Sequence, residues 1–200
     1  MINVNTILNM QLNKVTEWHS QMQCVEQELP WKFIEENTYW NFMLWHEEDI
    51  ARIKDIDPLR IVEAKRNIDK YNQLRNNSME KIDEWVLNYV TSNNIPAGKK
   101  LHSETPGMMI DRLSIITLKK YHMQEEVDRA DASEEHRQNC RGRVAILSEQ
   151  ISDLSAALQS VLEGIQQSEL SFKVYRQLKM YNDPSLNPQL YSRKQTTVNE

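Results

Sequence analysis

Polar side chains that can move protons or hold an anion recur among apolar residues in three consecutive segments. Residues three or four positions apart share a helix face, so helical spacing turns these groups toward the side that should face a core. Imidazole changes charge near neutral pH and suits acid–base chemistry, whereas guanidinium and carboxylate groups bind anions or orient a base. In chain order, the groups are His46, Asp49, Asn72, Arg75, Asp111 and His122.

Two interpretations of this polar stripe stay open. In the first it is a structural network, because a buried charge needs a partner and an unpaired one costs several kcal/mol. Arg75 would then bridge Asp49 and Asp111. In the second it is a binding pocket, since bundles build ligand sites from side chains on facing helices. His46 and His122 would be the catalytic acid and base if the protein is an enzyme.

The third segment has a strongly signalled helix start at Thr105, Pro106 and Gly107. The Thr hydroxyl can cap, Pro suits the first turn, and Gly leaves that turn uncovered. The free N–H groups and the positive dipole end of a bare helix start attract anions. With Arg112 one turn further in, a phosphate could bind here. The expected ligand-binding residues are Asp49, Asn72, Arg75, Thr105, Gly107, Asp111 and Arg112.

A metal site is the third interpretation, but we expect no metal ligands among these residues. His46 with Asp49, and His122 with Glu125, each form a His-x-x-carboxylate pair. That order is the reverse of the Glu-x-x-His pairs of di-iron bundles, and the additional carboxylates of that pattern are not evident. The cofactor is left unknown, and neither a nucleophile elbow nor a Gly-rich phosphate loop occurs.

The helices that must position these residues are delimited mainly by prolines and caps. Pro30 ends the first helix, Thr38 caps the second after a connector, and Pro58 starts the third behind Asp57. A loop over residues 93–103 leads to Thr105, and Asp131 begins the last long helix with a capping-box spacing. The expected helices are residues 5–29, 38–55, 58–92, 106–130 and about 133–178.

The last of these helices carries a coiled-coil-like apolar seam. The alternation persists for over four heptads, and the helix is longer than a compact bundle of this mass needs. Its far half could be covered by a partner chain or by the N-terminal helix, which has the same seam spacing, and we expect a homodimer through this helix. We expect one helical-bundle domain over residues 1–191 and a disordered polar tail over residues 192–200. The seam is formed by Val144, Leu147, Ile151, Leu154, Leu158, Val161, Ile165, Ser168, Phe172 and Tyr175.

Composition predicts an all-α fold, an elongated antiparallel helical bundle of about five main helices. The chain has 200 residues, of which 40% are apolar and only four are Gly, and it lacks the turn dipeptides of β-hairpins. Its net charge of −5 argues against nucleic acid as a partner, because tracking phosphates needs a basic stripe.

Two isolated thiols, Cys24 and Cys140, give neither a disulfide framework nor a zinc site and fit a reducing compartment. No run of eighteen apolar residues occurs, and the N-terminal stretch lacks the features of an export signal. We therefore expect a cytoplasmic protein with no membrane span.

Five blocks of sequence together resemble the bacterial family catalogued as domain of unknown function four-two-five-four. The blocks are WHEEDIAR, YNQLRNNSMEKID, SETPGMMIDRLSI, KKYHMQEEVDRADAS and KMYNDPSLNPQLY. The resemblance covers nearly the whole chain. It implies that the family's recurring polar positions are His46, Glu48, Asp49, Arg52, Arg75, Asp111, Arg112, His122 and Arg129.

The resemblance also implies a setting, because genes of this family often lie near glycosyltransferases for lipopolysaccharide or other surface glycans. It supplies no activity. The favoured function is binding of a small anionic ligand, a phosphosugar or sugar nucleotide, in an accessory role in surface-polysaccharide synthesis. The alternatives are a protein–protein interaction module, with a glycosyltransferase as a possible partner, and a metal-dependent hydrolase of nucleotides or sugar nucleotides.

Overall fold

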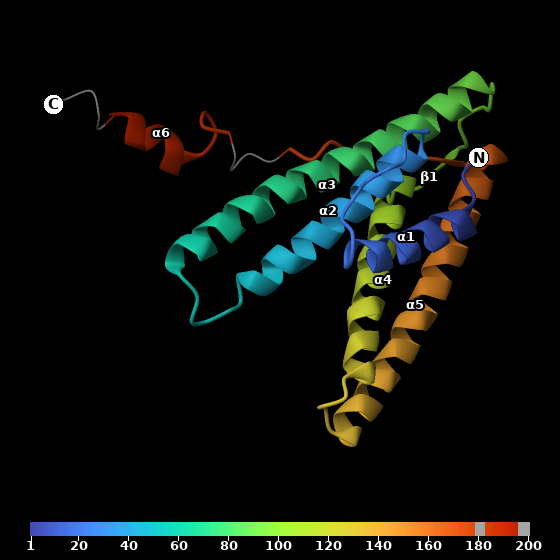
Figure 1. Ribbon diagram of the computed structural model, residues 1–200. Helices are drawn as coiled ribbons and strands as arrows, with labels where there is room; N and C mark the ends of the chain where they lie inside the picture. Colours follow the sequence, from blue (N-terminus) through green and yellow to red (C-terminus); the bar gives the residue numbers. More distant parts are fainter. Residues whose placement is uncertain (179–182, 196–200) are drawn as a thin grey trace.

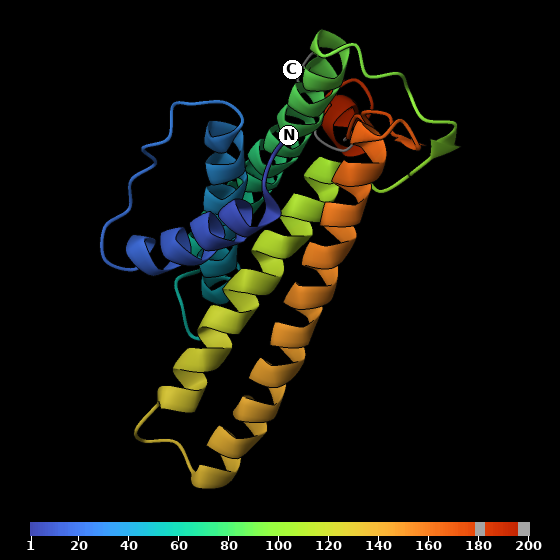
Figure 2. The same ribbon diagram turned by 90° about the vertical axis from the view of Figure 1, so that its right-hand side faces the viewer.

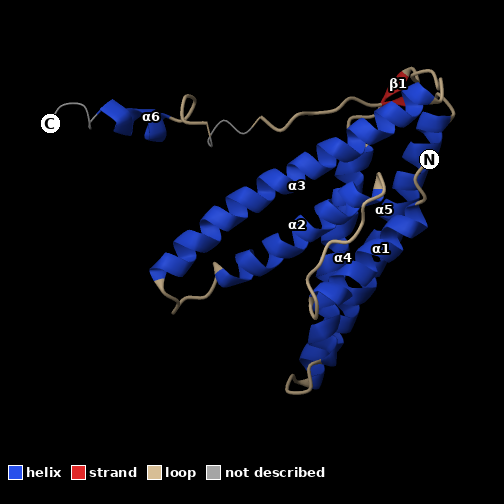
Figure 3. Cartoon of the chain, turned by 45° about the horizontal axis from the view of Figure 1, so that its top comes forward, coloured by secondary structure: helices blue, strands red, loops and turns tan. Residues whose placement is uncertain are grey.

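The computed structural model describes residues 1–178 and 183–195 and is predominantly helical in them, as Figure 3 shows. The all-α prediction is thereby confirmed, and strand is limited to one short parallel pair. In chain order the elements are α1 (Val4–Trp18), α2 (Trp31–Ile50), α3 (Pro58–Ser92), β1 (Lys100–Leu101), α4 (Pro106–Asp128), α5 (Glu134–Gln166), β2 (Leu170–Ser171) and α6 (Pro188–Gln195).

Two antiparallel helical hairpins make up most of the molecule. Helices α2 and α3 form one and α4 and α5 the other, and the two hairpins cross each other, with α1 lying over them (Figures 1 and 2). Helix α4 contacts each of α1, α2, α3 and α5. The side chains of α4 are therefore the ones that can meet groups from every other long helix.

Local caps fix the starts of three helices. The Asp57 carboxylate accepts the N–H of Leu59 and starts α3, and the Thr105 hydroxyl accepts the N–H of Met108 and starts α4, both as predicted. Helix α5 begins where its predicted range of about 133–178 begins, but its cap is Ser133 and not the expected Asp131: the Ser133 hydroxyl accepts the N–H of His136. Ser133 directly precedes two acidic residues, which the positive end of the helix dipole favours.

The first helix ends eleven residues earlier than predicted, at Trp18, and residues 19–30 form a loop. The cause is a tertiary interaction: the Glu35 carboxylate, only 1% exposed, accepts the N–H groups of Val25 and Glu26 at 2.8–3.1 Å. Helix α2 also begins earlier, so Thr38 lies inside the helix. Its hydroxyl donates to the carbonyl of residue 34 and caps nothing.

The long C-terminal helix is also shorter than predicted, because it ends at Gln166 and does not continue to residue 178. Ser168 adopts a positive φ of 60°, which stops helical continuation, and the next residues pair with β1 as the short strand β2. Of the predicted seam, Phe172 is still buried, but as part of this strand segment.

One hydrophobic cluster draws on all five long helices. The seam of α5 takes part in it from Ile151 to Ile165, where α4 and α1 pack against α5, whereas Val144 and Leu147 are only half-buried. Helix α6 spans the expected boundary at residue 191, and residues 196–200 of the expected tail lie outside the described residues. No helix in the described ranges combines the length and apolarity needed to cross a membrane.

Candidate functional site

Helix α2 is rotated about its axis relative to the predicted orientation. The helical spacing predicts His46 on its inward face, but His46 is only half-buried, as are Tyr39 and Met43 on the same side of the helix. The fully buried polar positions of α2 are instead Glu35, Asn37, Thr38, Asn41 and Glu47. This rotation decides which polar groups meet the neighbouring helices α3 and α4.

Arg75 of α3 and Asp111 of α4 form a two-pronged ion pair in the core between the hairpins. Arg75 Nε donates to Asp111 Oδ1 at 2.8 Å, and Nη2 donates to Oδ2 at 2.7 Å. The amide nitrogens of Asn37 and Asn41 donate to the same Oδ1 at 3.0 and 2.9 Å. Asp111 is 3% exposed, so its charge is balanced by four hydrogen bonds inside the fold.

The predicted pairing of Arg75 with Asp111 is present in the structure, but the expected bridge to Asp49 is wrong. Asp49 is exposed on the outer side of α2, and the two Asn amides occupy the place that it would have taken. Asn72 lies beside the pair, with its Oδ1 3.5 Å from Arg75 Nη1. The Asp111 carboxylate is fully paired in this network, which is the arrangement of a register-fixing contact, although the buried Oδ1 of Asn37 has no partner within the described residues.

The start of α4 is not a bare anion site. The N–H of Gly107 donates to Asp83 Oδ1 at 2.7 Å, and the Thr105 hydroxyl already accepts from Met108. A Cβ on Gly107 would come within 2.4 Å of the backbone oxygen of Met79, so only glycine lets α4 approach α3 this closely. The carboxylate of Asp83 occupies the place in which a phosphate was expected.

Burial raises the pKa of the Asp83 carboxyl to about 6, although its hydrogen bonds from Thr105 and Gly107 lower it. The carboxyl is 3% exposed, and no cation of the described residues is bonded to it. Arg112 does not take part, because it points to the surface and pairs with Glu104. The predicted grouping of Thr105, Gly107, Arg112 and Arg75 into one site is therefore not found.

His46 of α2 and His122 of α4 do come together, and a third histidine joins them. His19, at the C-terminal end of α1, completes a cluster in which one ring nitrogen from each residue lies within 4.8 Å of the others. The ring centroids are 5.2–5.6 Å apart. Burial lowers the pKa of His46, and the nearby His122 and His19 lower it further, so a neutral ring is favoured there.

The cluster and the ion-pair network are two separate levels of the fold. Asp111 and His122 are eleven residues apart on α4, about 16 Å along the helix axis. The polar stripe expected from the sequence is therefore split: Arg75 and Asp111 form one part, and His46 and His122 meet His19 in the other.

A pocket of about 530 Å³ lies beside His122, between α2, α4 and α5. Trp45, Met123, Ile146 and Leu147 provide its apolar lining. Ligand pockets in proteins have volumes of about 300–1,000 Å³, and few polar groups among apolar walls. The pocket is therefore large enough for a sugar phosphate.

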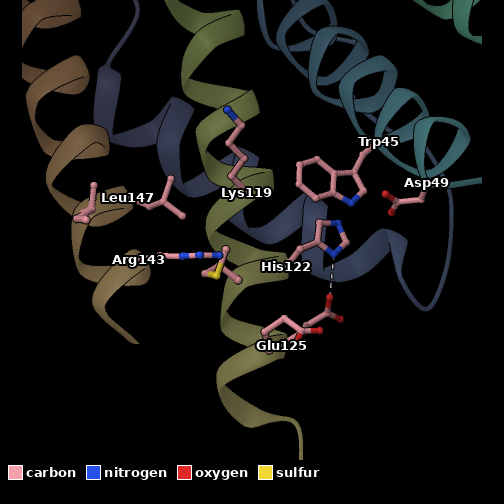
Figure 4. Close-up of a pocket in the computed structure, with 10 residues that line it drawn as sticks. Trp45, Asp49, Lys119, His122, Glu125, Arg143 and Leu147 are labelled. Atoms are coloured by element: carbon pink, nitrogen blue, oxygen red, sulfur yellow. Dashed lines mark hydrogen bonds and ion pairs between the residues drawn. The ribbon is translucent and has the colours of Figure 1, made fainter. Parts of the chain in front are cut away.

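Three charged side chains of this pocket are uncommitted. Lys119 of α4, Arg143 of α5 and Asp49 of α2 form no side-chain hydrogen bond or ion pair within the described residues. Figure 4 shows Arg143 extending from α5 toward α4 and Lys119 on α4 above His122. The other two acids of the lining are already engaged: Glu125 with His122 at 2.8 Å, and Glu126 with Arg129 at 2.8 Å.

A second pocket of about 460 Å³ adjoins the first and shares Trp45, Asp49 and Lys119 with it. It brings in the outer side of the Arg75 network, so Asp49, Asn72 and Arg75 of the predicted set line one hollow. The two hollows together form a groove that crosses α4 at Lys119.

Several residues of the site were missed from the sequence. His19 lay in the middle of the helix predicted over residues 5–29, and neither Lys119 nor Asn41 was among the expected site residues. The phase of α2 could have been derived from Asn37 and Asn41, which are four residues apart and follow Ile34 on one face. No sequence pattern predicts the position of His19, because it lies where the loop after α1 begins.

Comparison with protein-family models gives a match over residues 31–174 to a family described as "Protein of unknown function (DUF4254)". The match includes His46, Arg75, Asp111, Lys119 and Arg143, and it leaves α1 outside. No curated protein and no solved structure matches the chain.

Proposed function

The chain belongs to the DUF4254 family, whose description assigns no activity, and we therefore propose a function from the site: binding of a small phosphorylated sugar in the groove across α4. The observation that carries this proposal is the pair of uncommitted cations, Lys119 and Arg143, which line one pocket from two facing helices. Paired cations without an internal partner offer charge-assisted hydrogen bonds to a phosphate.

The remaining lining suits the other parts of such a ligand. The free carboxylate of Asp49 can accept hydrogen bonds from sugar hydroxyls. The indole of Trp45 lies where the two hollows meet and offers an apolar surface to a sugar or nucleobase. The groove therefore combines a site for an anion, an acceptor for hydroxyl groups and an aromatic wall.

Sugar nucleotides and phosphosugars are the class we favour. Besides the groove, this choice draws on the setting that the family resemblance implies, in which such molecules supply the sugars for lipopolysaccharide and other surface glycans. The role would be an accessory one, in the cytoplasm, where these precursors are made.

Isothermal titration with uridine diphosphate glucose, glucose 1-phosphate and pyrophosphate tests the proposal. We expect binding of at least one probe, and a loss of about tenfold or more in affinity for Lys119→Ala and for Arg143→Ala, since a hydrogen bond to a charged group contributes about 1.5–3 kcal/mol. Lys120→Ala is the matched control, because Lys120 neighbours Lys119 but does not line the pocket. No binding of any probe, or equal affinity in all three variants, would overturn the proposal.

An interaction module is the second candidate, and the C-terminal segment favours it. Its apolar side chains Leu178, Leu186, Leu190 and Tyr191 are 85%, 50%, 40% and 46% exposed. Exposed apolar residues in sequence proximity are typical of segments that dock on another protein. A glycosyltransferase is the partner that the family resemblance implies, and a metal-dependent hydrolase is the third candidate.

A further inference from the structure

We propose that His19, His46 and His122 form a binding site for one divalent transition-metal ion, with Zn²⁺ as the reference ion. This proposal is independent of phosphosugar binding, although His122 also lines the groove. The site joins the end of α1 to α2 and α4, so its three ligands come from three separate elements.

The hydrogen bonds of the rings leave ligand nitrogens free. Nδ1 of His19 lies 2.7 Å from the carbonyl oxygen of Val15, and Nδ1 of His122 lies 2.8 Å from Glu125 Oε2. A carbonyl and a carboxylate only accept, so each Nδ1 carries the proton and each Nε2 keeps its lone pair. Metal-bound histidines are held in this way, with the second ring nitrogen donating to a carbonyl or carboxylate.

Two of the nitrogens have no partner at all within the described residues. Nε2 of His46 and Nε2 of His122 are fully buried and make no hydrogen bond. A buried polar atom without a partner is unfavourable, and such atoms call for a specific explanation. One ion between the rings would satisfy both atoms at once.

Aromatic residues orient the rings toward each other. Trp45 stacks on His122 with a centroid distance of 4.6 Å and an interplanar angle of 8°, and Tyr121 stacks on His19 at 4.4 Å (Figure 4 shows Trp45 and His122). Phe42 contacts His19 edge to face at 4.9 Å. An apolar shell of this kind limits ring rotation and solvent access around a metal.

The donor set selects the class of ion. Three neutral imidazoles suit Zn²⁺, Cu²⁺, Ni²⁺ and Co²⁺, and a site with three protein ligands keeps a fourth position for water or another ligand. With metal–nitrogen distances of about 2.0–2.1 Å, the three nitrogens of a tetrahedral site lie about 3.3 Å apart. Small ring movements from the present separations reach this geometry, and the exposed ring of His19 gives the ion access from solvent.

The test uses the full chain stripped with a chelator and metal alone as the probe. Equilibrium dialysis should give one Zn²⁺ per chain, and Co²⁺ should give the intense visible absorption of a tetrahedral site. His46→Gln and His122→Gln should each weaken Zn²⁺ binding more than a hundredfold, because even indirect changes around a metal cost ten- to a hundredfold. His102→Gln is the control, since His102 contacts Glu104 and lies outside the cluster.

His19→Gln is the variant that we expect to remain folded, because the exposed His19 can be replaced without disturbing the core. It should also weaken Zn²⁺ binding, with an unchanged circular dichroism spectrum. The groove variants Lys119→Ala and Arg143→Ala should bind Zn²⁺ like the natural chain, which separates this site from the proposed function. Less than one Zn²⁺ per two chains at saturation, or unchanged affinity in His46→Gln and His19→Gln, would overturn the proposal.

Discussion

At the scale of single residues, side chains of the same type have different roles in the structure. Asp111 and Asp83 are both buried acids, but Asp111 has a guanidinium partner and Asp83 has only neutral donors. Asp49, which was expected to join Arg75, is exposed and uncommitted. What a charged residue does here follows from its partners, and the sequence reveals only some of them.

Arg75→Met should destabilise the protein strongly, because it leaves the Asp111 carboxylate buried with two Asn donors and no cation. Removing one partner of a buried ion pair costs about 3–5 kcal/mol. Arg75 is 25% exposed, so we expect a loss near the lower end of that range, measured by urea unfolding.

Arg52→Met is the control for that experiment. Arg52 pairs with Glu48 on the surface, with side chains 69% and 44% exposed, and exposed pairs contribute less than about 1 kcal/mol. A loss in Arg75→Met no larger than in Arg52→Met would show that the network does not stabilise the fold.

Asp83 should make stability depend on pH. The folded-state pKa of Asp83 is about 6, above the ordinary value of 3.8. The stabilisation that the protonated carboxyl adds to the free energy of unfolding is therefore fully present below pH 4 and is lost as pH rises through 6. Each pKa unit corresponds to about 1.4 kcal/mol, which gives a loss of about 3 kcal/mol. Urea unfolding from pH 4 to 8 should show this decline relative to Asp83→Asn.

Asp153→Asn controls for the general effect of removing a carboxylate, since Asp153 is exposed on α5. The difference in free energy of unfolding between Asp153→Asn and the natural chain should stay constant from pH 4 to 8. A flat difference for Asp83→Asn as well would mean that Asp83 is not desolvated as the structure shows.

The Arg75–Asp111 pair could be derived from the sequence because both residues sit on the apolar stripes of neighbouring long helices. Asn37 and Asn41 were not found, because the inward face predicted for α2 was the one that carries His46. The role of His19 could not be derived from the sequence, because the position of its ring depends on the loop after α1 and not on a helical repeat.

At the scale of the elements, helices with strong local signals were placed correctly. Asp57 with Pro58, and Thr105 with Pro106, combine a side-chain cap with a proline in the first turn, and both helices begin there. The end of α1 and the start of α2 depend on Glu35, which binds backbone ten residues away. Boundaries set by tertiary contacts cannot be derived from local propensity.

Gly107→Ala should disrupt the contact between α3 and α4. Its Cβ would meet the backbone oxygen of Met79 at 2.4 Å and Asp83 Oδ1 at 2.9 Å, and backbone cannot rotate aside as a side-chain end can. Overpacking of this kind costs about 1–3 kcal/mol, which thermal unfolding would show as a lower Tm.

Gly142→Ala is the matched substitution, because its Cβ would meet nothing within 4 Å inside helix α5. There the change should stabilise the protein by about 0.5–1 kcal/mol, from helix propensity. Opposite signs for the two variants are expected. A neutral Gly107→Ala would contradict the close approach of α4 to α3.

At the scale of the whole molecule, one helix organises the fold and the groove. Helix α4 contacts all four other long helices and supplies Asp111, Lys119 and His122 to three different groupings. The homodimer stays a prediction, and part of its basis is gone, because the α5 seam from Ile151 to Ile165 is buried within the chain. Sedimentation velocity on the full chain would test it.

Truncation after Leu178 should leave the bundle stable. In the part of the chain that the structure describes, helix α6 makes no extensive contact with another helix, whereas Arg176, which pairs with Glu80 and Glu84, is retained. We expect the free energy of unfolding to change by less than about 1 kcal/mol, the range of surface changes. A larger loss would show that the C-terminal segment belongs to the core domain.

The most direct test of phosphosugar binding is a crystal structure of the chain with uridine diphosphate glucose. We predict that its phosphate oxygens lie within about 3 Å of Lys119 Nζ and the Arg143 guanidinium, the length of a charge-assisted hydrogen bond. Clear density for the ligand at any other surface, with the groove holding only water, would contradict the proposed function.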